Sequence, residues 1–249
     1  MGGIVTHQEN EAFQKPDNEN STIWRYLDFT KFVSLLDKQA LYFARSDKLG
    51  DPFEGSYPKM TVKARPLTMR ASDMSVFNEE IRQSVIINSW TMSEFESAAM
   101  WKLYSAGNKS VAIQSTLKRL AKSFDSYTRA DVFIGQVMYI DYETEYLPEG
   151  NVFYPLLHKR RSFEHEHELR AMISKFPSND LVEWFNTDLP QKAFVDGEYV
   201  DVNLDVLVES IFVSPASPPW FCDLIRSVVN KYSLSKKVTQ SSLDNSPVF

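Results

Sequence analysis

The sequence predicts an α+β fold (mixed α/β), in which a single domain holds a central mixed, largely antiparallel sheet flanked by helices. Helical and strand patterns intermingle along the chain with no internal repeat and no clear linker. The chain has 249 residues, 43% hydrophobic and 24% charged, which is typical of a globular protein with a sizeable core. We expect one globular domain over residues 22–240, between flexible polar tails at 1–21 and 241–249.

The chain is expected to open with two strands around a helix. Residues 23–27 are β-prone, and Asp28 or Thr30 then caps a segment with apolar residues at helical spacing. Residues 40–44 form the second predicted strand. Glycines and a proline in 47–55 predict a turn with several acidic side chains.

The middle of the chain continues this alternation of helices and strands. Helical spacing of apolar residues marks three segments, and apolar or alternating runs mark three strands. The expected helices are 72–82, 95–104 and 117–124, and the expected strands are 85–92, 111–114 and 132–142.

The last part of the chain is expected to contain the same kinds of element. A proline after Ser217 favours the start of a long helix with an apolar stripe that reaches Tyr232. The expected elements before it are a short helix near 151–161, a charged strand at 158–173, a helical turn at 180–186, and strands at 198–203 and 208–213.

Composition excludes several classes of protein. Glycine is sparse, and neither of the two glycine-rich phosphate-binding motifs is present. A net charge of −6 gives no global attraction to nucleic acid or anionic membranes. The single cysteine, Cys222, rules out an intrachain disulfide and a cysteine-cluster zinc site. Without a signal-peptide pattern or a long apolar run, we expect a cytoplasmic protein with no membrane partner.

The stretch His158–Ile173 is the best candidate for chemistry. On a strand, alternate side chains share a face, so Glu164, Glu166, Glu168 and Arg170 would lie together. Carboxylates in such a row repel one another unless they meet water, a cation or a polar ligand. The alternative is a solvated strand face whose charges are neutralised by nearby arginines.

Several blocks in order resemble the bacterial domain-of-unknown-function 2971 family. They begin with Trp24-Arg25-Tyr26, and continue through the stretches 41–47 and 51–55. Later blocks are Met100-Trp101-Lys102-Leu103-Tyr104 and Glu166-His167-Glu168-Leu169-Arg170, and the last ends at Pro215. The resemblance covers roughly residues 22–240 and carries no activity in its name.

The layout of strands and a late glutamate also resembles mono-ADP-ribosyltransferases. That resemblance implies NAD as the substrate, with Glu168 as the catalytic carboxylate and Glu166 as the base that deprotonates an acceptor. It implies Arg25 or Tyr26 as NAD-binding residues of the first strand. For the middle part of the NAD site it leaves two candidates open, the block from Ser89 to Ser93 and the pair Tyr42-Phe43.

The resemblance also suggests a toxin or phage-defence setting with an unknown acceptor, protein or nucleic acid. Two other functions stay open. The chain could be a non-catalytic domain for sensing or protein interaction, with the glutamates as a salt-bridged surface. It could also be a metal-dependent hydrolase that uses His165 and His167, although no third ligand follows at a fixed spacing and we expect no metal.

Overall fold

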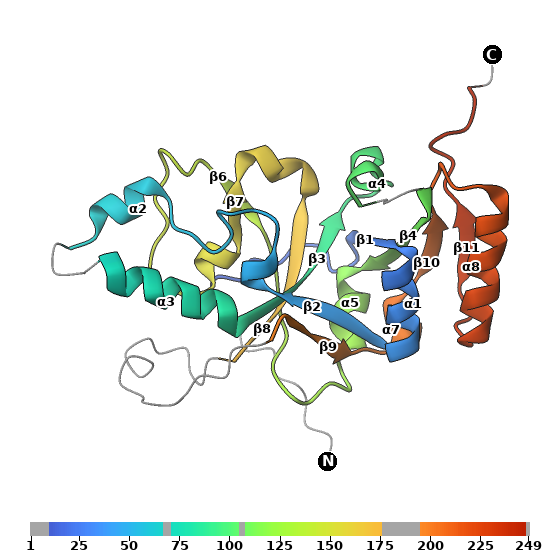
Figure 1. Cartoon of the computed structure of the whole chain (residues 1–249), viewed down its shortest axis with the longest axis horizontal. Coiled ribbons are helices and arrows are strands. Elements are labelled where there is room, and N and C mark those ends of the chain that lie inside the picture. Colours follow the sequence, from blue (N-terminus) through green and yellow to red (C-terminus); the bar gives the residue numbers. More distant parts are fainter. Residues whose placement is uncertain (1–9, 67–70, 105–107, 176–194, 248–249) are drawn as a thin grey trace. The chain divides into compact units, whose positions relative to one another are not determined.

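The computed structural model describes residues 10–66, 71–104, 108–175 and 195–247. Its sheet is mixed and largely antiparallel and is flanked by helices, which confirms the predicted fold class (Figure 1). The chain divides into two compact units. Unit 1 comprises Met1–Lys15, Tyr42–Ser89 and Arg129–Glu198, and unit 2 comprises Pro16–Leu41, Trp90–Thr128 and Tyr199–Phe249. The single-domain boundaries at 22 and 240 stay a prediction.

Unit 2 contains one end of the sheet. Strand β1 (Thr22–Asp28) pairs antiparallel with β4 (Ser110–Thr116), and β10 (Ser210–Val213) pairs antiparallel with the other side of β4. Strand β11 (Lys237–Gln240) adds to β10 in parallel. The end of β3 (Val85–Met92) pairs with the start of β1. Apolar and aromatic side chains bury both faces of β1 and β4, since consecutive residues such as Ile23 and Trp24 are buried.

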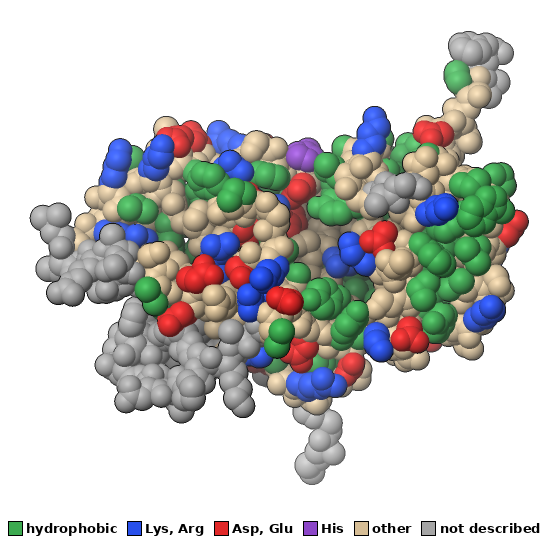
Figure 2. Space-filling view, viewed as in Figure 1, with side chains coloured by type: hydrophobic (Ala, Val, Ile, Leu, Met, Phe, Trp, Pro, Cys, Tyr) green, Lys and Arg blue, Asp and Glu red, His purple; other side chains and the backbone are tan. Residues whose placement is uncertain are grey.

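Helices of unit 2 pack against these strands. They are α1 (Phe29–Lys38), α4 (Ala98–Tyr104), α5 (Leu117–Ser123), α7 (Leu204–Leu207) and α8 (Pro219–Lys231). The carboxylate of Asp28 accepts a hydrogen bond from the amide of Lys31 at 2.8 Å, which confirms the predicted helix cap. Hydrophobic side chains gather over α8 in Figure 2, where Trp220 and Leu224 are exposed.

Unit 1 contains further strands of the sheet and a small second sheet. Strand β8 (Glu168–Ser174) pairs antiparallel with β5 (Phe133–Gln136) and also neighbours β3. The end of β2 (Ala40–Arg45) pairs antiparallel with β3. The small sheet joins β6 (Met138–Ile140) and β7 (His158–Arg160) in parallel. Strand β9 (Gly197–Asp201) begins in this unit.

Within the described ranges, the helical segments of unit 1 are short apart from one. They are α2 (Lys59–Ala64), α3 (Ala71–Ser84) and the 3-10 turns η1 (Ser46–Lys48), η3 (Tyr154–Leu156) and η4 (Arg161–Glu166). Figure 1 shows α3 as the long helix of this part of the chain. The expected helix near 151–161 shrinks to η3, and the expected strand 132–142 is divided into β5 and β6. The helical turn expected at 180–186 lies outside the described residues.

The core of unit 1 includes residues from the stretch expected to be a tail. Phe13 is buried and its ring lies 5.2 Å from that of Phe133 and 5.0 Å from that of Phe153, centroid to centroid. Gly135 makes room for it, since an added Cβ there would come within 2.9 Å of the Phe13 Cα. An aromatic side chain in an otherwise polar stretch therefore fixes this part of the N-terminal region to the core.

The prediction of one continuous strand over 158–173 was wrong. Strand β7 ends at Arg160, η4 occupies Arg161–Glu166, and β8 starts at Glu168. Between them His167 adopts a left-handed conformation with a φ of 40°. A strand would have to bury alternate members of this run of charged side chains. The turn instead leaves most of them in water and buries the chain again from Glu168 onward.

Candidate active site

Glu168 and Arg170 occupy the same face of β8, as the alternation of side chains on a strand requires. The guanidinium of Arg170 donates from Nε to Oε1 of Glu168 at 2.8 Å and from Nη2 to Oε2 at 3.0 Å. Glu168 is 5% exposed and Arg170 is fully buried. This part of the prediction for the charged stretch holds, but the pair is buried and is not a solvated face.

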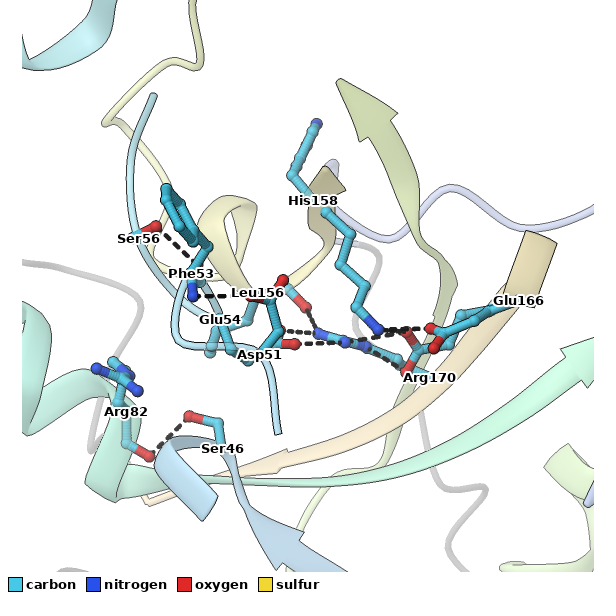
Figure 3. Close-up of polar contacts among 12 residues, drawn as sticks. Ser46, Asp51, Phe53, Glu54, Ser56, Arg82, Leu156, His158, Glu166 and Arg170 are labelled. Atoms are coloured by element: carbon cyan, nitrogen blue, oxygen red, sulfur yellow. Dashed lines mark hydrogen bonds and ion pairs between the residues drawn. The ribbon is translucent and has the colours of Figure 1, made fainter. Parts of the chain in front are cut away.

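The turn after β2 places a second carboxylate on Arg170. Glu54, which is 2% exposed, accepts from both terminal nitrogens of Arg170, with Nη2 at 3.0 Å from Oε2. Figure 3 shows Asp51 and Glu54 on one side of Arg170 and Glu166 on the other. The backbone turns sharply after Glu54, because Gly55 has a φ of +71°, a conformation that favours glycine. The acidic turn predicted at 47–55 thus supplies a carboxylate to the interior.

Lys159 of β7 completes the cluster from the other side. Its Nζ lies 3.1 Å from Oε2 of Glu168 and 2.5 Å from Oε2 of Glu166. The ammonium also lies 4.9 Å from the centre of the Phe163 ring. Lys159 is 8% exposed, and buried lysines are rare unless they are paired. Glu166 and Glu168 therefore lie close together, because both pair with Lys159. They do so although η4 and His167 take the place of the predicted continuous strand.

The charges fix the protonation of Glu168. Burial by itself would raise the pKa of this carboxyl, but the charges of Arg170 and Lys159 and hydrogen bonds from Arg170 and Ser89 lower the pKa to about 2. Burial would lower the pKa of Lys159, and Glu168 and Glu166 raise it above its ordinary value. Near neutral pH, both groups are therefore charged.

Ser89 of β3 is brought to Glu168 by the pairing of β3 with β8. Hydrogen bonding by the Ser89 side chain helps to lower the pKa of the Glu168 carboxyl. Ser89 is half-buried, whereas Glu168 is buried. The neighbouring Asn88 donates its side-chain amide to the backbone oxygen of Tyr42 at 2.9 Å, and Tyr42 itself is 41% exposed. Two blocks are candidates for the middle part of the NAD site. The described contacts connect the block from Ser89 to Ser93 with Glu168, through Ser89.

Other members of the cluster were not singled out by sequence reasoning. They are Lys159 and Tyr139. The hydroxyl of Tyr139 accepts a hydrogen bond from the amide of Glu168 at 2.8 Å. Burial is the main cause that raises the pKa of Tyr139. The alternation of polar and apolar residues in 132–142 places Tyr139 on a predicted strand. It gives no signal that this strand lies beside Glu168.

The other two predicted NAD-binding residues, Arg25 and Tyr26, belong to unit 2. Tyr26 is 7% exposed, its hydroxyl accepts from the amide of Ser97 at 2.9 Å, and its ring meets that of Trp101 edge-on at 5.0 Å. Burial is the main cause that raises the pKa of Tyr26 to about 12. Arg25, one position away on β1, is half-buried. A site that combines these residues with Glu168 stays a prediction.

The histidines do not share a strand face. His165 lies in η4 and His167 in the left-handed position after it, and both are exposed. His158 donates from Nδ1 to the backbone oxygen of Tyr154 at 2.7 Å. Across the described ranges, no group of three His, Cys, Asp or Glu side chains could hold a metal ion. Across the same ranges, no helix is long and apolar enough to cross a membrane.

Comparisons with known proteins give one weak likeness. No protein-family model matches the sequence, and no curated protein matches it. Membership of the domain-of-unknown-function 2971 family therefore stays a prediction. Among solved structures, Thermus sp. 2.9 DarT in complex with carba-NAD+ aligns with a TM-score of 0.37 and 10% sequence identity, over 90% of this chain and 96% of that one. At this score the likeness carries no conclusion about the chemistry of this chain.

Proposed function

We propose that this chain is an NAD-dependent enzyme of the ADP-ribosyltransferase type, with Glu168 as its central carboxylate. The observation that carries the proposal is the pairing of β3 with β8, which brings Ser89 close enough to the Glu168 carboxyl to help lower its pKa. The sequence resemblance implies Glu168 as the catalytic glutamate, and Ser89 begins one of the two blocks that it leaves open for the middle part of the NAD site. The two residues come from strands far apart in the chain. Their contact is what such an enzyme requires of its middle and late strands.

The reaction needs a fixed negative charge beside the nicotinamide ribose. The bond between C1′ of the ribose and the nicotinamide nitrogen breaks, and its electron pair stays on the nitrogen, so neutral nicotinamide leaves. The ribose then carries oxocarbenium-like positive charge, which a carboxylate stabilises. A nucleophilic oxygen or nitrogen of the acceptor forms a new bond to C1′ and gives its proton to a base.

The contacts favour different roles for the two glutamates. Arg170, Lys159 and Ser89 together give Glu168 four hydrogen bonds or ion contacts, which is the usual capacity of a carboxylate. Glu168 therefore acts as a fixed charge. Glu166 has one such partner in the described part of the chain, Lys159, and its side chain is 12% exposed. Glu166 is the better placed of the two to take the proton of an acceptor.

The balance of charge in the cluster supports this role. Glu54, Glu166 and Glu168 face the two cations Lys159 and Arg170. The carboxylates exceed the cations by one, counted over these five side chains. A partly desolvated site with excess negative charge favours a ligand in which positive charge develops, such as the nicotinamide ribose of NAD.

The biological setting belongs to the same proposal. We take the protein to act in the bacterial cytoplasm, in a toxin or phage-defence role, on a protein or nucleic acid acceptor. These points rest on the sequence resemblance alone. Arg25 and Tyr26 of β1 and Tyr42 are the further residues that the proposal assigns to NAD.

Transfer of labelled ADP-ribose tests the proposal. Purified protein is incubated with NAD labelled in its adenylate part, together with bacterial lysate, and acceptors are separated and counted. Wild type labels an acceptor, Glu168→Gln does not, and Glu166→Gln loses labelling more than it loses nicotinamide release. Glu164→Gln, a change at an exposed position of η4, is the matched control and keeps both activities.

A non-catalytic sensing or interaction domain is the second candidate function. The observation that favours it is the full set of partners on Glu168, which suits a purely structural ion pair as well. No labelling and no nicotinamide release by wild type, together with no shift of its melting temperature by NAD, would favour this alternative and oppose the enzyme.

A further inference from the structure

Arg160, which the proposed reaction does not use, lies against two aromatic rings. Its Cζ is 4.2 Å from the centre of the Phe53 ring and 5.3 Å from that of Phe163. Phe53 is itself held edge-on by Tyr142, with ring centres 5.7 Å apart. A guanidinium stacked on aromatic faces keeps its N–H groups in a defined plane, and their edge stays available to a ligand.

Asp51 fixes the guanidinium without using all its donors. Nη2 of Arg160 donates to Oδ1 of Asp51 at 2.8 Å, and the same oxygen accepts from the amide of Phe53 at 3.0 Å. A guanidinium has five N–H donors. Over the described residues, the one hydrogen bond from Arg160 goes to Asp51, and the buried Nε has no partner. The Arg160 side chain is 34% exposed, so part of the fork faces solvent.

The position of Arg160 relates it to the candidate active site. Lys159, its neighbour on β7, pairs with Glu166 and Glu168 and also lies against the Phe163 ring. Asp51 belongs to the same turn as Glu54, which binds Arg170. The Phe163 ring is thus in contact both with a half-exposed arginine and with the lysine of the carboxylate cluster.

We propose that Arg160 is an anion-binding residue for a phosphate group, and that the group is the pyrophosphate of the dinucleotide whose ribose meets Glu168. The planar fork of a guanidinium matches two oxygens of a phosphate. Because Phe53, Phe163 and Asp51 already hold the side chain, binding costs little additional side-chain ordering. The identity of the ligand rests on the proposed function, whereas the anion site does not.

A phosphorylated acceptor would offer Arg160 the same phosphate oxygens as the dinucleotide. The titration therefore uses ligands that distinguish these two sources of phosphate. Wild-type protein is titrated by calorimetry with ADP-ribose, with inorganic phosphate and with adenosine, which lacks phosphate. We expect ADP-ribose to bind, and Arg160→Met to weaken its binding by about tenfold to a hundredfold, as for loss of a charged hydrogen-bonded contact. Arg161→Met is the matched control, because Arg161 is exposed and pairs with Glu145. It keeps the wild-type affinity.

Two further variants keep the test valid if Arg160→Met does not fold. Arg160→Met leaves Asp51 buried without its cation, so Asp51→Asn is combined with it to remove both charges. Asp51→Asn alone removes the carboxylate that competes for the guanidinium, and we expect it to tighten ADP-ribose binding severalfold. A purely structural Arg160 predicts no tightening. Circular dichroism checks the fold of each variant.

The outcomes separate this inference from the proposed enzyme. Weaker ADP-ribose binding in Arg160→Met without NAD cleavage by wild type supports the anion site and opposes the enzyme. Unchanged ADP-ribose affinity in Arg160→Met, or no binding of phosphate-bearing ligands by wild type, overturns the anion site even if NAD is cleaved. Binding of inorganic phosphate through Arg160 with no gain from ADP-ribose overturns the assignment to the dinucleotide.

Discussion

Glu168 and Arg170 form a two-point ion pair on one face of β8, and both side chains are almost completely removed from solvent. Two charges are costly to bury unless their hydrogen bonds are satisfied. Here Glu54 and the backbone oxygen of Leu156 take the remaining donors at the end of Arg170, the latter at 2.5 Å. The pair therefore anchors the acidic turn, β8 and η3 in unit 1, whatever chemistry it performs.

Removal of the arginine should unfold much of unit 1. Arg170→Met leaves Glu54 and Glu168 buried without their main counter-charge, and breaking such a pair costs about 3–5 kcal/mol. Denaturant unfolding measures this loss as a lower midpoint. Arg226→Met, which removes an exposed pair with Asp223 in α8, is the control and should cost less than about 1 kcal/mol. Equal losses in the two variants would show that the buried network is not a source of stability.

Acid should destabilise the protein partly through Glu168. Burial raises its pKa, and Arg170 and Lys159 more than offset this, so the folded pKa falls from 4.5 to about 2. A lowered folded pKa gives stability that is complete above the unfolded pKa and is lost as the pH falls toward the folded one. Its size is about 3 kcal/mol. Between about pH 4.5 and 2, wild type should lose that much more unfolding free energy than Glu168→Gln. Parallel pH profiles of the two proteins would contradict the shift.

Loss of the Ser89 hydroxyl should affect activity more than stability. Ser89→Ala removes one hydrogen bond to Glu168, which contributes about 1 kcal/mol to folding. If Ser89 also orients the nicotinamide ribose, NAD turnover should fall by about a hundredfold. Ser34→Ala is the control, since Ser34 belongs to α1 and its hydroxyl shares a hydrogen bond with that of Tyr199 at 2.8 Å. Similar turnover in both variants would remove Ser89 from the site.

The turn that carries Glu54 should not tolerate a side chain after it. Gly55→Ala places a Cβ within 2.8 Å of Arg82 Cγ and 3.0 Å of Leu156 Cδ2, at a φ of +71°. The left-handed backbone alone costs about 1–2 kcal/mol for a residue with a Cβ. Gly50→Ala, in the same turn region, meets nothing within 4 Å and serves as the control. The melting temperatures of the two variants should differ, and equal values would contradict the packing described for Gly55.

Local patterns in the sequence predicted the elements of the fold well where one face is buried. The cap at Asp28 and the strand that carries Ser89 follow from residue types and spacing. The alternation rule also placed Glu168 and Arg170 on one face, because those two residues do lie on a strand.

The rest of the site depends on contacts between distant residues. The alternation rule failed for Glu164 and Glu166, since a row of charged residues formed a 3-10 turn. Nothing in the local pattern indicates that Glu54 and Lys159 converge on β8. The packing of Phe13 could not be predicted either, because one aromatic residue in a polar stretch gives no periodicity. Its position depends on the space beside Gly135, which is distant in the sequence.

Release of nicotinamide from NAD by purified wild type and Glu168→Gln distinguishes a catalytic Glu168 from a purely structural one. Glutamine keeps the size and most hydrogen bonds of the glutamate but removes its charge, and circular dichroism confirms that the variant is folded. We expect release by wild type and a loss of at least about a thousandfold in Glu168→Gln, because the charge that stabilises the oxocarbenium-like ribose is gone. Equal release by the two folded proteins would contradict the assignment of Glu168, and with it the proposed reaction.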